Sequence, residues 1–162
     1  MNKEKANKIF DDMDLDKNGT IDVDEFVFGM KKMMGVDTFA DNEFKAIFSM
    51  CDGCSLFHKK DGKLSRKEFA RVAKAIPNRS SGYDALSEEE KEVSDKKRLG
   101  TFIFNIIDED RSGNISLKEL TKFVVALGKP KESAEKLMAR VDKSKDKQIS
   151  LDEFIDWYCG DL

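Results

Sequence analysis

One short pattern recurs four times along this chain, and it restricts the fold more than any other feature of the sequence. In each copy an isoleucine or leucine is followed, four residues later, by a glutamate that directly precedes a phenylalanine or leucine. The four pairs are Ile21–Glu25, Leu64–Glu68, Ile115–Glu119 and Ile149–Glu153. A pattern repeated in this way indicates one supersecondary unit that is used four times.

The segments between the copies have the apolar spacing of amphipathic helices. The clearest set follows the i, i+3, i+4, i+7, i+8 positions and comprises Leu99, Phe102, Ile103, Ile106 and Ile107. These positions fall on one face of a helix with 3.6 residues per turn. Because the chain also contains only two prolines, we expect an all-α fold.

The polar segment that precedes the first glutamate has the spacing of a metal-binding loop. Counted from Asp14, side-chain oxygens fall at positions 1, 3, 5, 9 and 12, and Gly19 falls at position 6. This is the arrangement of an EF-hand loop, which surrounds Ca²⁺ with about seven oxygens. The expected ligands, with one backbone carbonyl from the threonine, are Asp14, Asp16, Asn18, Thr20, Asp22 and Glu25.

Two further copies have the same spacing with weaker ligand sets. In the third copy the expected ligands are Asp108, Asp110, Ser112, Asn114, Ser116 and Glu119. In the fourth copy they are Asp142, Ser144, Asp146, Gln148, Ser150 and Glu153. The third loop has one ligating carboxylate fewer than the first. In the fourth loop Lys147 replaces the turn glycine, so we expect it to bind Ca²⁺ most weakly.

The second copy departs from the pattern, and two registers are open. Alignment on Gly62 and Glu68 places Phe57 and Lys59 at ligand positions 1 and 3. The favoured alternative is an enlarged loop that begins at Asp52 and ends at Glu68. In either register we expect no ordinary Ca²⁺ site, although Asp52, Asp61 and Glu68 leave an irregular one open. The hand would then serve as a structural partner, through pairing of Ile21 with Leu64 in a short β-ribbon.

Turn and capping signals divide the chain into two halves. Pro77 ends one helical segment, and Ser87 with Glu90 forms a capping box that opens the next. The expected organisation is an N-terminal pair of hands at 1–78, a linker at 79–86 and a C-terminal pair at 87–162.

With these motifs, the sequence resembles the calmodulin/troponin C superfamily of four-EF-hand proteins over nearly its whole length. The segment from Leu86 to Glu90 is similar to the linker of calmodulin. The resemblance implies two lobes, each a pair of EF-hands, joined by a helical or flexible linker. The chain departs from that pattern in the second loop, in the longer 77–98 connection and at Lys147.

Composition excludes several other classes of protein. The net charge is −3, whereas nucleic-acid-binding proteins usually carry a basic stripe. The start of the chain is polar, which argues against a signal peptide, and no apolar run is long enough to span a membrane. Three cysteines without a disulfide framework indicate a reducing, cytoplasmic location. With one histidine and no nucleotide-binding motif, we expect a non-enzymatic monomer.

Three functional hypotheses follow. The first is a calcium sensor whose loaded lobe exposes an apolar groove for an amphipathic helix of a target protein, or of an enzyme to which it is a subunit. Phe26, Met30, Met33 and Met34 lie on one helical side and suit such a groove, or they are ordinary core residues. The second hypothesis is a calcium buffer or a constitutive, light-chain-like regulatory subunit. The third and most remote is a zinc or thiol-redox protein that uses Cys51 and Cys54, with His58 and Cys159 as further zinc ligands.

Overall fold

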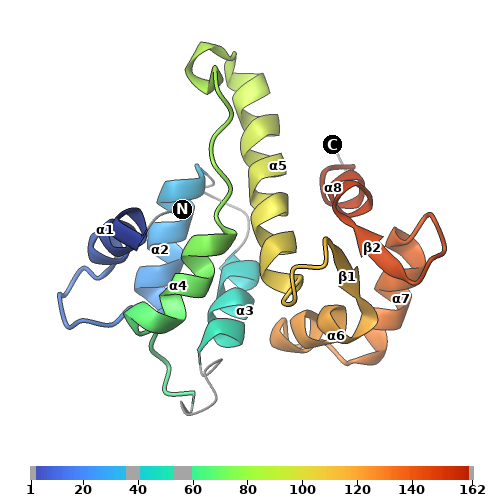
Figure 1. The fold of residues 1–162 in the computed structure, drawn as a ribbon, viewed down its shortest axis with the longest axis horizontal. Helices are drawn as coiled ribbons and strands as arrows, with labels where there is room; N and C mark the ends of the chain where they lie inside the picture. Colours follow the sequence, from blue (N-terminus) through green and yellow to red (C-terminus); the bar gives the residue numbers. More distant parts are fainter. Residues whose placement is uncertain (1–2, 36–40, 53–59, 161–162) are drawn as a thin grey trace. The chain divides into compact units, whose positions relative to one another are not determined.

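The computed structural model describes residues 3–35, 41–52 and 60–160. The chain divides into two compact units, Met1–Ile76 and Pro77–Leu162, and each is mostly helical (Figure 1). The predicted all-α fold with short β pairings is therefore confirmed. Residues 77–86, which include the expected linker, are grouped with the second unit. Among the described helices, none is both long enough and apolar enough to cross a membrane.

The described residues of the first unit form four helices arranged as two helix–loop–helix hands. They are α1 (Lys3–Met13), α2 (Val23–Met34), α3 (Asp41–Cys51) and α4 (Arg66–Ala75). Aromatic contacts contribute to its core: Phe10 lies edge-on to Phe69 and Phe26 edge-on to Phe48, each at 5.6 Å between ring centroids. All four rings are buried, and burial of rings of this size is a main source of stability in a small domain.

The second unit repeats this arrangement with a longer first helix. Its elements are the 3₁₀ turn η1 (Tyr83–Ala85), α5 (Glu88–Ile107), β1 (Asn114–Ser116), α6 (Leu117–Ala126), α7 (Glu132–Val141), β2 (Gln148–Ser150) and α8 (Leu151–Cys159). Strands β1 and β2 pair antiparallel, with Ile115 opposite Ile149. Both isoleucines are buried, so the ribbon joins two loops and also contributes to the core.

The two loops of the first unit are joined in the same way. Ile21 and Leu64 form an isolated antiparallel bridge, with the amide of Ile21 donating to the carbonyl of Leu64 at 3.0 Å and the reverse bond at 2.8 Å. Both side chains are fully buried. The predicted pairing of Ile21 with Leu64 is therefore confirmed.

The repeated glutamate has a structural role in every hand, because it is the third residue of the helix and forms a capping box with the N-cap residue. Its backbone N–H is bound by the side chain of the N-cap residue, and its carboxylate accepts the N-cap amide. The four boxes are Asp22–Glu25, Ser65–Glu68, Ser116–Glu119 and Ser150–Glu153. The same glutamate therefore fixes where the second helix of each hand begins and presents a carboxylate to the loop.

The segment before α5 is held against that helix. The Tyr83 hydroxyl donates to Asp95, and Arg98 Nε donates to the Pro77 carbonyl at 3.3 Å. The hydrogen bond to Asp95 raises the pKa of Tyr83. Helix α5 begins at Glu88 with the Ser87–Glu90 capping box that the sequence predicts.

Candidate metal centres

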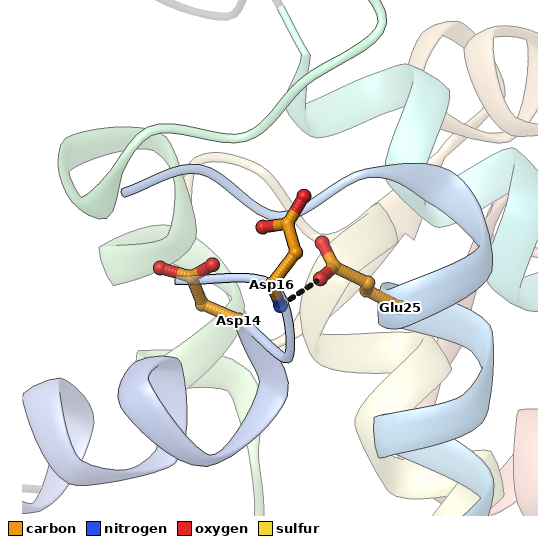
Figure 2. A group of neighbouring side chains, drawn as sticks. All are labelled: Asp14, Asp16 and Glu25. Atoms are coloured by element: carbon orange, nitrogen blue, oxygen red, sulfur yellow. Dashed lines mark hydrogen bonds between the residues drawn. The ribbon is translucent and has the colours of Figure 1, made fainter. Parts of the chain in front are cut away.

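The first loop brings three carboxylates together. One oxygen each of Asp14, Asp16 and Glu25 lies within 4.8 Å of the other two (Figure 2). Asp14 directly follows α1, Asp16 lies in the loop, and Glu25 belongs to the first turn of α2. Because three negative groups cluster here, the loop offers hard oxygen donors of the kind that Ca²⁺ prefers.

Backbone amides hold these carboxylates in place. The two oxygens of Asp14 accept the amides of Asn18 and Gly19 at 3.0 and 2.9 Å. Glu25 Oε1 accepts the amide of Leu15 at 2.9 Å. Gly19 has a φ of 84°, a left-handed conformation that glycine adopts without strain. The residue types of the loop thus fit a calcium ion both in charge and in backbone shape.

The other expected ligands of the first loop bond to the loop itself. Asn18 Nδ2 donates to Asp16 at 2.7 Å, and Asn18 Oδ1 accepts the amide of Thr20 at 2.8 Å. Asp22 Oδ1 accepts the amides of Asp24 and Glu25, both at 2.9 Å, as the N-cap of α2. Of the five side chains predicted to bind the ion, the structure gathers the carboxylates of three, while Asn18 and Asp22 form hydrogen bonds that shape the loop.

The third loop has the same pattern of contacts as the first loop. Oxygens of Asp108, Asp110 and Glu119 also lie within 4.8 Å of one another. Asp108 accepts the amides of Ser112 and Gly113 at 3.0 and 2.9 Å, in the manner of Asp14.

Hydrogen bonds favour the charged form of two carboxylates in the third loop, Glu119 and Asp110. Burial raises the pKa of Glu119, but bonds from Ser116 and from the amides of Glu109 and Asp110 together hold it below its usual value. The side-chain bond with Ser112 lowers the pKa of Asp110. The remaining predicted ligand, Asn114, lies in β1 and accepts the Ser112 hydroxyl at its carbonyl, at 2.9 Å.

The fourth loop does not bring three carboxylates together within the part of the chain that the structure describes. Asp142 accepts the amides of Lys145 and Lys147, at loop positions 4 and 6, at 2.7 and 2.9 Å. Asp14 and Asp108 accept the amides at loop positions 5 and 6 instead. Asp146 Oδ1 accepts the amide of Gln148 at 2.9 Å, and Ser144 donates to Asp142 at 3.1 Å. The missing third carboxylate follows from Ser144, which stands at loop position 3, where loops 1 and 3 have Asp16 and Asp110.

The turn of the fourth loop has a lysine in place of the glycine of loops 1 and 3. Lys147 has a φ of 68°, in the left-handed region that costs a non-glycine residue about 1 kcal/mol. We expect Lys147→Gly to stabilise the ion-free protein by about this amount and to raise the Ca²⁺ affinity of the loop. Chemical denaturation and titration calorimetry measure the two effects. Lys147→Ala removes the same charge but keeps the strained backbone, so equal gains from both variants would contradict the backbone explanation.

Glu153 makes the stability of the ion-free protein depend on pH. Hydrogen bonds from Ser150 and Ser144 lower its pKa from 4.5 to about 2. A lowered pKa in the folded state stabilises the fold above the unfolded pKa, and this contribution is lost as the pH falls from about 4.5 to 2. We therefore expect Glu153→Gln, measured by urea denaturation in a chelator, to lose less stability than the wild type between pH 5 and pH 2. Equal losses in the two proteins would show that Glu153 contributes nothing to the acid transition.

The second loop has its start where the favoured register predicts it. The two oxygens of Asp52 accept the amides of Asp61 and Gly62 at 3.1 and 3.0 Å, as Asp14 does with Asn18 and Gly19. Asp52 thus occupies the first loop position, and the glycine turn comes later in the sequence. Residues 53–59 lie outside the described residues.

The cysteine hypotheses depend largely on undescribed residues. Cys54 and His58 lie outside the described residues. Cys51 is fully buried in the first unit. Cys159 is half-buried at the end of α8, where burial raises the pKa of its thiol.

Comparison with known protein families agrees with these loops. Residues 96–159 match the EF-hand domain pair, and residues 5–33 match the EF hand domain. The two matched segments contain loops 1, 3 and 4. They do not contain the second loop, in which Asp52 bonds to the amides of residues 9 and 10 positions later. In the first loop, Asp14 bonds to the amides of residues only 4 and 5 positions later.

Relatives of similar length are calcium-binding proteins by name. The 16 kDa calcium-binding protein of Schistosoma mansoni is 28% identical, over 96% of this chain and 94% of its own. The probable calcium-binding protein CML43 of Arabidopsis thaliana is also 28% identical, over 95% of this chain and 81% of its own. Among solved structures, calcium-loaded apo-aequorin of Aequorea victoria is 20% identical with a TM-score of 0.41, over 98% of this chain and 88% of its own.

Proposed function

We propose that this chain is a calmodulin-like calcium sensor that captures an amphipathic helix of a target protein. EF-hand models match residues 5–33 and 96–159, and proteins named as calcium-binding are among its relatives. The observation that carries the proposal is the cluster of Asp14, Asp16 and Glu25 (Figure 2). Two of these carboxylates belong to the loop, whereas the third lies on α2. An ion bound by all three would therefore act directly on a helix.

Helix α2 also covers the core of the first unit. Its side chains Phe26, Met30 and Met34 are fully buried. Reorientation of α2 on ion binding would expose them as an apolar surface. Methionine side chains are flexible and polarizable, so they adapt to different target helices. In the sensor hypothesis these residues form the core of the unit before Ca²⁺ binds and the groove for the target helix after α2 has moved.

The proposed protein binds Ca²⁺ in hands one, three and four and keeps the second hand as a structural partner. Each ion adds two positive charges, so three ions would change the net charge of −3 to +3. A change in the sign of the net charge reverses the protein's electrostatic field. After Ca²⁺ binding, that field would favour association with negatively charged surfaces. In this proposal the protein is a cytoplasmic, non-catalytic monomer.

The decisive test follows the fluorescence of the apolar dye ANS as free Ca²⁺ is raised over millimolar Mg²⁺. A saturable increase is expected, because loading exposes apolar surface. The double variant Glu25→Gln/Glu119→Gln is the matched control, since it should give a much smaller increase over the same range. A flat signal in the wild type, with binding confirmed by calorimetry, would contradict the sensor function.

A calcium buffer or light-chain-like subunit is the second candidate, and one observation favours it. The carboxylates of loops 1 and 3 are already gathered by backbone amides, so binding requires little rearrangement of the loop. Buffer EF-hands bind Ca²⁺ with little opening. The flat ANS signal described above is the result that this candidate predicts.

A further inference from the structure

A groove lies between α1 and α4 of the first unit, away from the calcium loops. Its volume is about 630 Å³, within the range of sites that hold ligands. Its apolar lining consists of Phe10, Phe69 and the small side chains of Ala6, Ala70 and Ala73. The small alanine side chains leave space for side chains of a partner.

The edges of the groove are positively charged. Lys3, Arg66, Lys67 and Lys74 line it, and the described lining includes no acidic residue. This concentration of positive charge contrasts with the net charge of −3 of the whole chain. Arg66 closes one end, since it pairs with Asp11 and lies 4.3 Å from the centroid of the Phe10 ring. The lysines leave the positive field open to a negative partner.

We propose that this groove docks an acidic amphipathic helix of a partner protein, and that it does so with or without calcium. The lining residues of α1 run from Lys3 to Phe10, a length of about 10 Å, or two turns of helix. A helix with small apolar residues on one face and Asp or Glu at its edges would place its apolar face on the alanines and its carboxylates beside the lysines.

Independence from calcium follows from the way α1 and α4 are joined. Phe10 packs edge-on to Phe69, and Arg66 reaches over Phe10 to Asp11. None of these contacts involves a residue of the first loop, and that loop connects α1 to α2 rather than to α4. The groove therefore differs from the apolar surface of the sensor proposal, which is exposed only when α2 moves. It also requires a partner helix of negative charge.

The test uses two labelled synthetic helical peptides, followed by fluorescence anisotropy. One has an Ala/Leu stripe flanked by Glu, and the other has Lys in place of each Glu. We expect the acidic peptide alone to bind, with the same affinity in EGTA and in saturating Ca²⁺. Lys67→Glu/Lys74→Glu should weaken binding by about tenfold or more. The control Lys8→Glu/Lys32→Glu makes the same change in net charge at exposed positions outside the groove and should leave the affinity nearly unchanged.

Several results would overturn the proposal. Equal weakening by the groove and control variants would indicate attraction by overall charge. Binding that appears only with Ca²⁺ would assign the peptide to the surface exposed by α2. Absence of peptide binding, together with binding to vesicles of anionic lipid that the groove variant abolishes, would make the occupant a membrane. Circular dichroism and a Ca²⁺ titration of each variant establish that the fold and the first loop are intact.

Discussion

Glu119→Gln is expected to remove one Ca²⁺ from the binding stoichiometry, and Glu25→Gln is expected to do the same for the first loop. Each change replaces a ligating carboxylate by a neutral amide of the same shape. The affinity of the loop should fall by about 100-fold or more, out of the range typical of sensors. Titration calorimetry of the ion-free protein measures both the stoichiometry and the affinity.

The fold should survive these substitutions, because a capping box accepts glutamine as well as glutamate at the third residue of the helix. Helices α2 and α6 would still begin at Val23 and Leu117. Glu68→Gln is the matched control, since it changes the equivalent residue of the second hand and should remove no ion. A lower stoichiometry in that variant would show that the second loop is an irregular calcium site.

Ile115→Ala is expected to have the largest effect on stability and to weaken calcium binding in two loops. Ile115 is fully buried and lies opposite Ile149 in the ribbon that joins loops 3 and 4. Removal of a buried isoleucine side chain costs about 2–5 kcal/mol. Because the ribbon fixes the two loops against each other, its loss should lower the Ca²⁺ affinity of both.

Chemical denaturation in a chelator measures the loss of stability, and calorimetry measures the affinities of the two loops. Val125→Ala provides the control, since Val125 is 53% exposed on α6 and should change stability by less than about 0.5 kcal/mol. If Ile115→Ala destabilised the fold while both affinities stayed unchanged, the ribbon would be structural only.

Much of the fold could be predicted from the sequence because its signals are local. The helical spacing around Phe102 and the Ser87–Glu90 capping box depend on residues close together in the chain, and both the helix and its start are found. The Ile21–Leu64 pairing joins residues distant in sequence, but it could be predicted because the pattern repeats in each hand.

The fourth loop shows where sequence spacing reaches its limit. Its oxygen-bearing residues have the spacing of the first loop, and the site was predicted on that basis. In the structure, Asp142 accepts the amide of Lys145, and the loop's carboxylates are not gathered as they are around Asp14. The backbone does not account for this, since Lys17 and Arg111 have left-handed φ values of 57° and 60°, close to the 62° of Lys145. The difference lies in Ser144, which supplies a hydroxyl at loop position 3, where Asp16 and Asp110 supply carboxylates. A spacing pattern that accepts any oxygen-bearing side chain does not distinguish the two. Whether Ca²⁺ gathers the ligands of this loop remains the prediction that Lys147→Gly tests.

The groove between α1 and α4 could not be predicted from the sequence. Its lysines lie in two segments of the chain, Lys3 near the start of α1 and Lys67 and Lys74 in α4. Each segment by itself has the composition of an ordinary solvated helix. Only the packing of Phe10 against Phe69 brings these charges to the edges of one apolar depression.

The amide-supported carboxylates of loops 1 and 3 have a consequence for the rate of signalling. Because Asp14 and Asp108 already hold their loops folded through bonds to the amides of Gly19 and Gly113, an arriving ion has to lose water but does not have to fold the chain. Association should then be fast and similar in the two loops. Differences in Ca²⁺ affinity between the two loops would arise mainly from their dissociation rates, as is usual among related binding sites. The duration of a response would be set by dissociation, and therefore by the number of carboxylates in each loop.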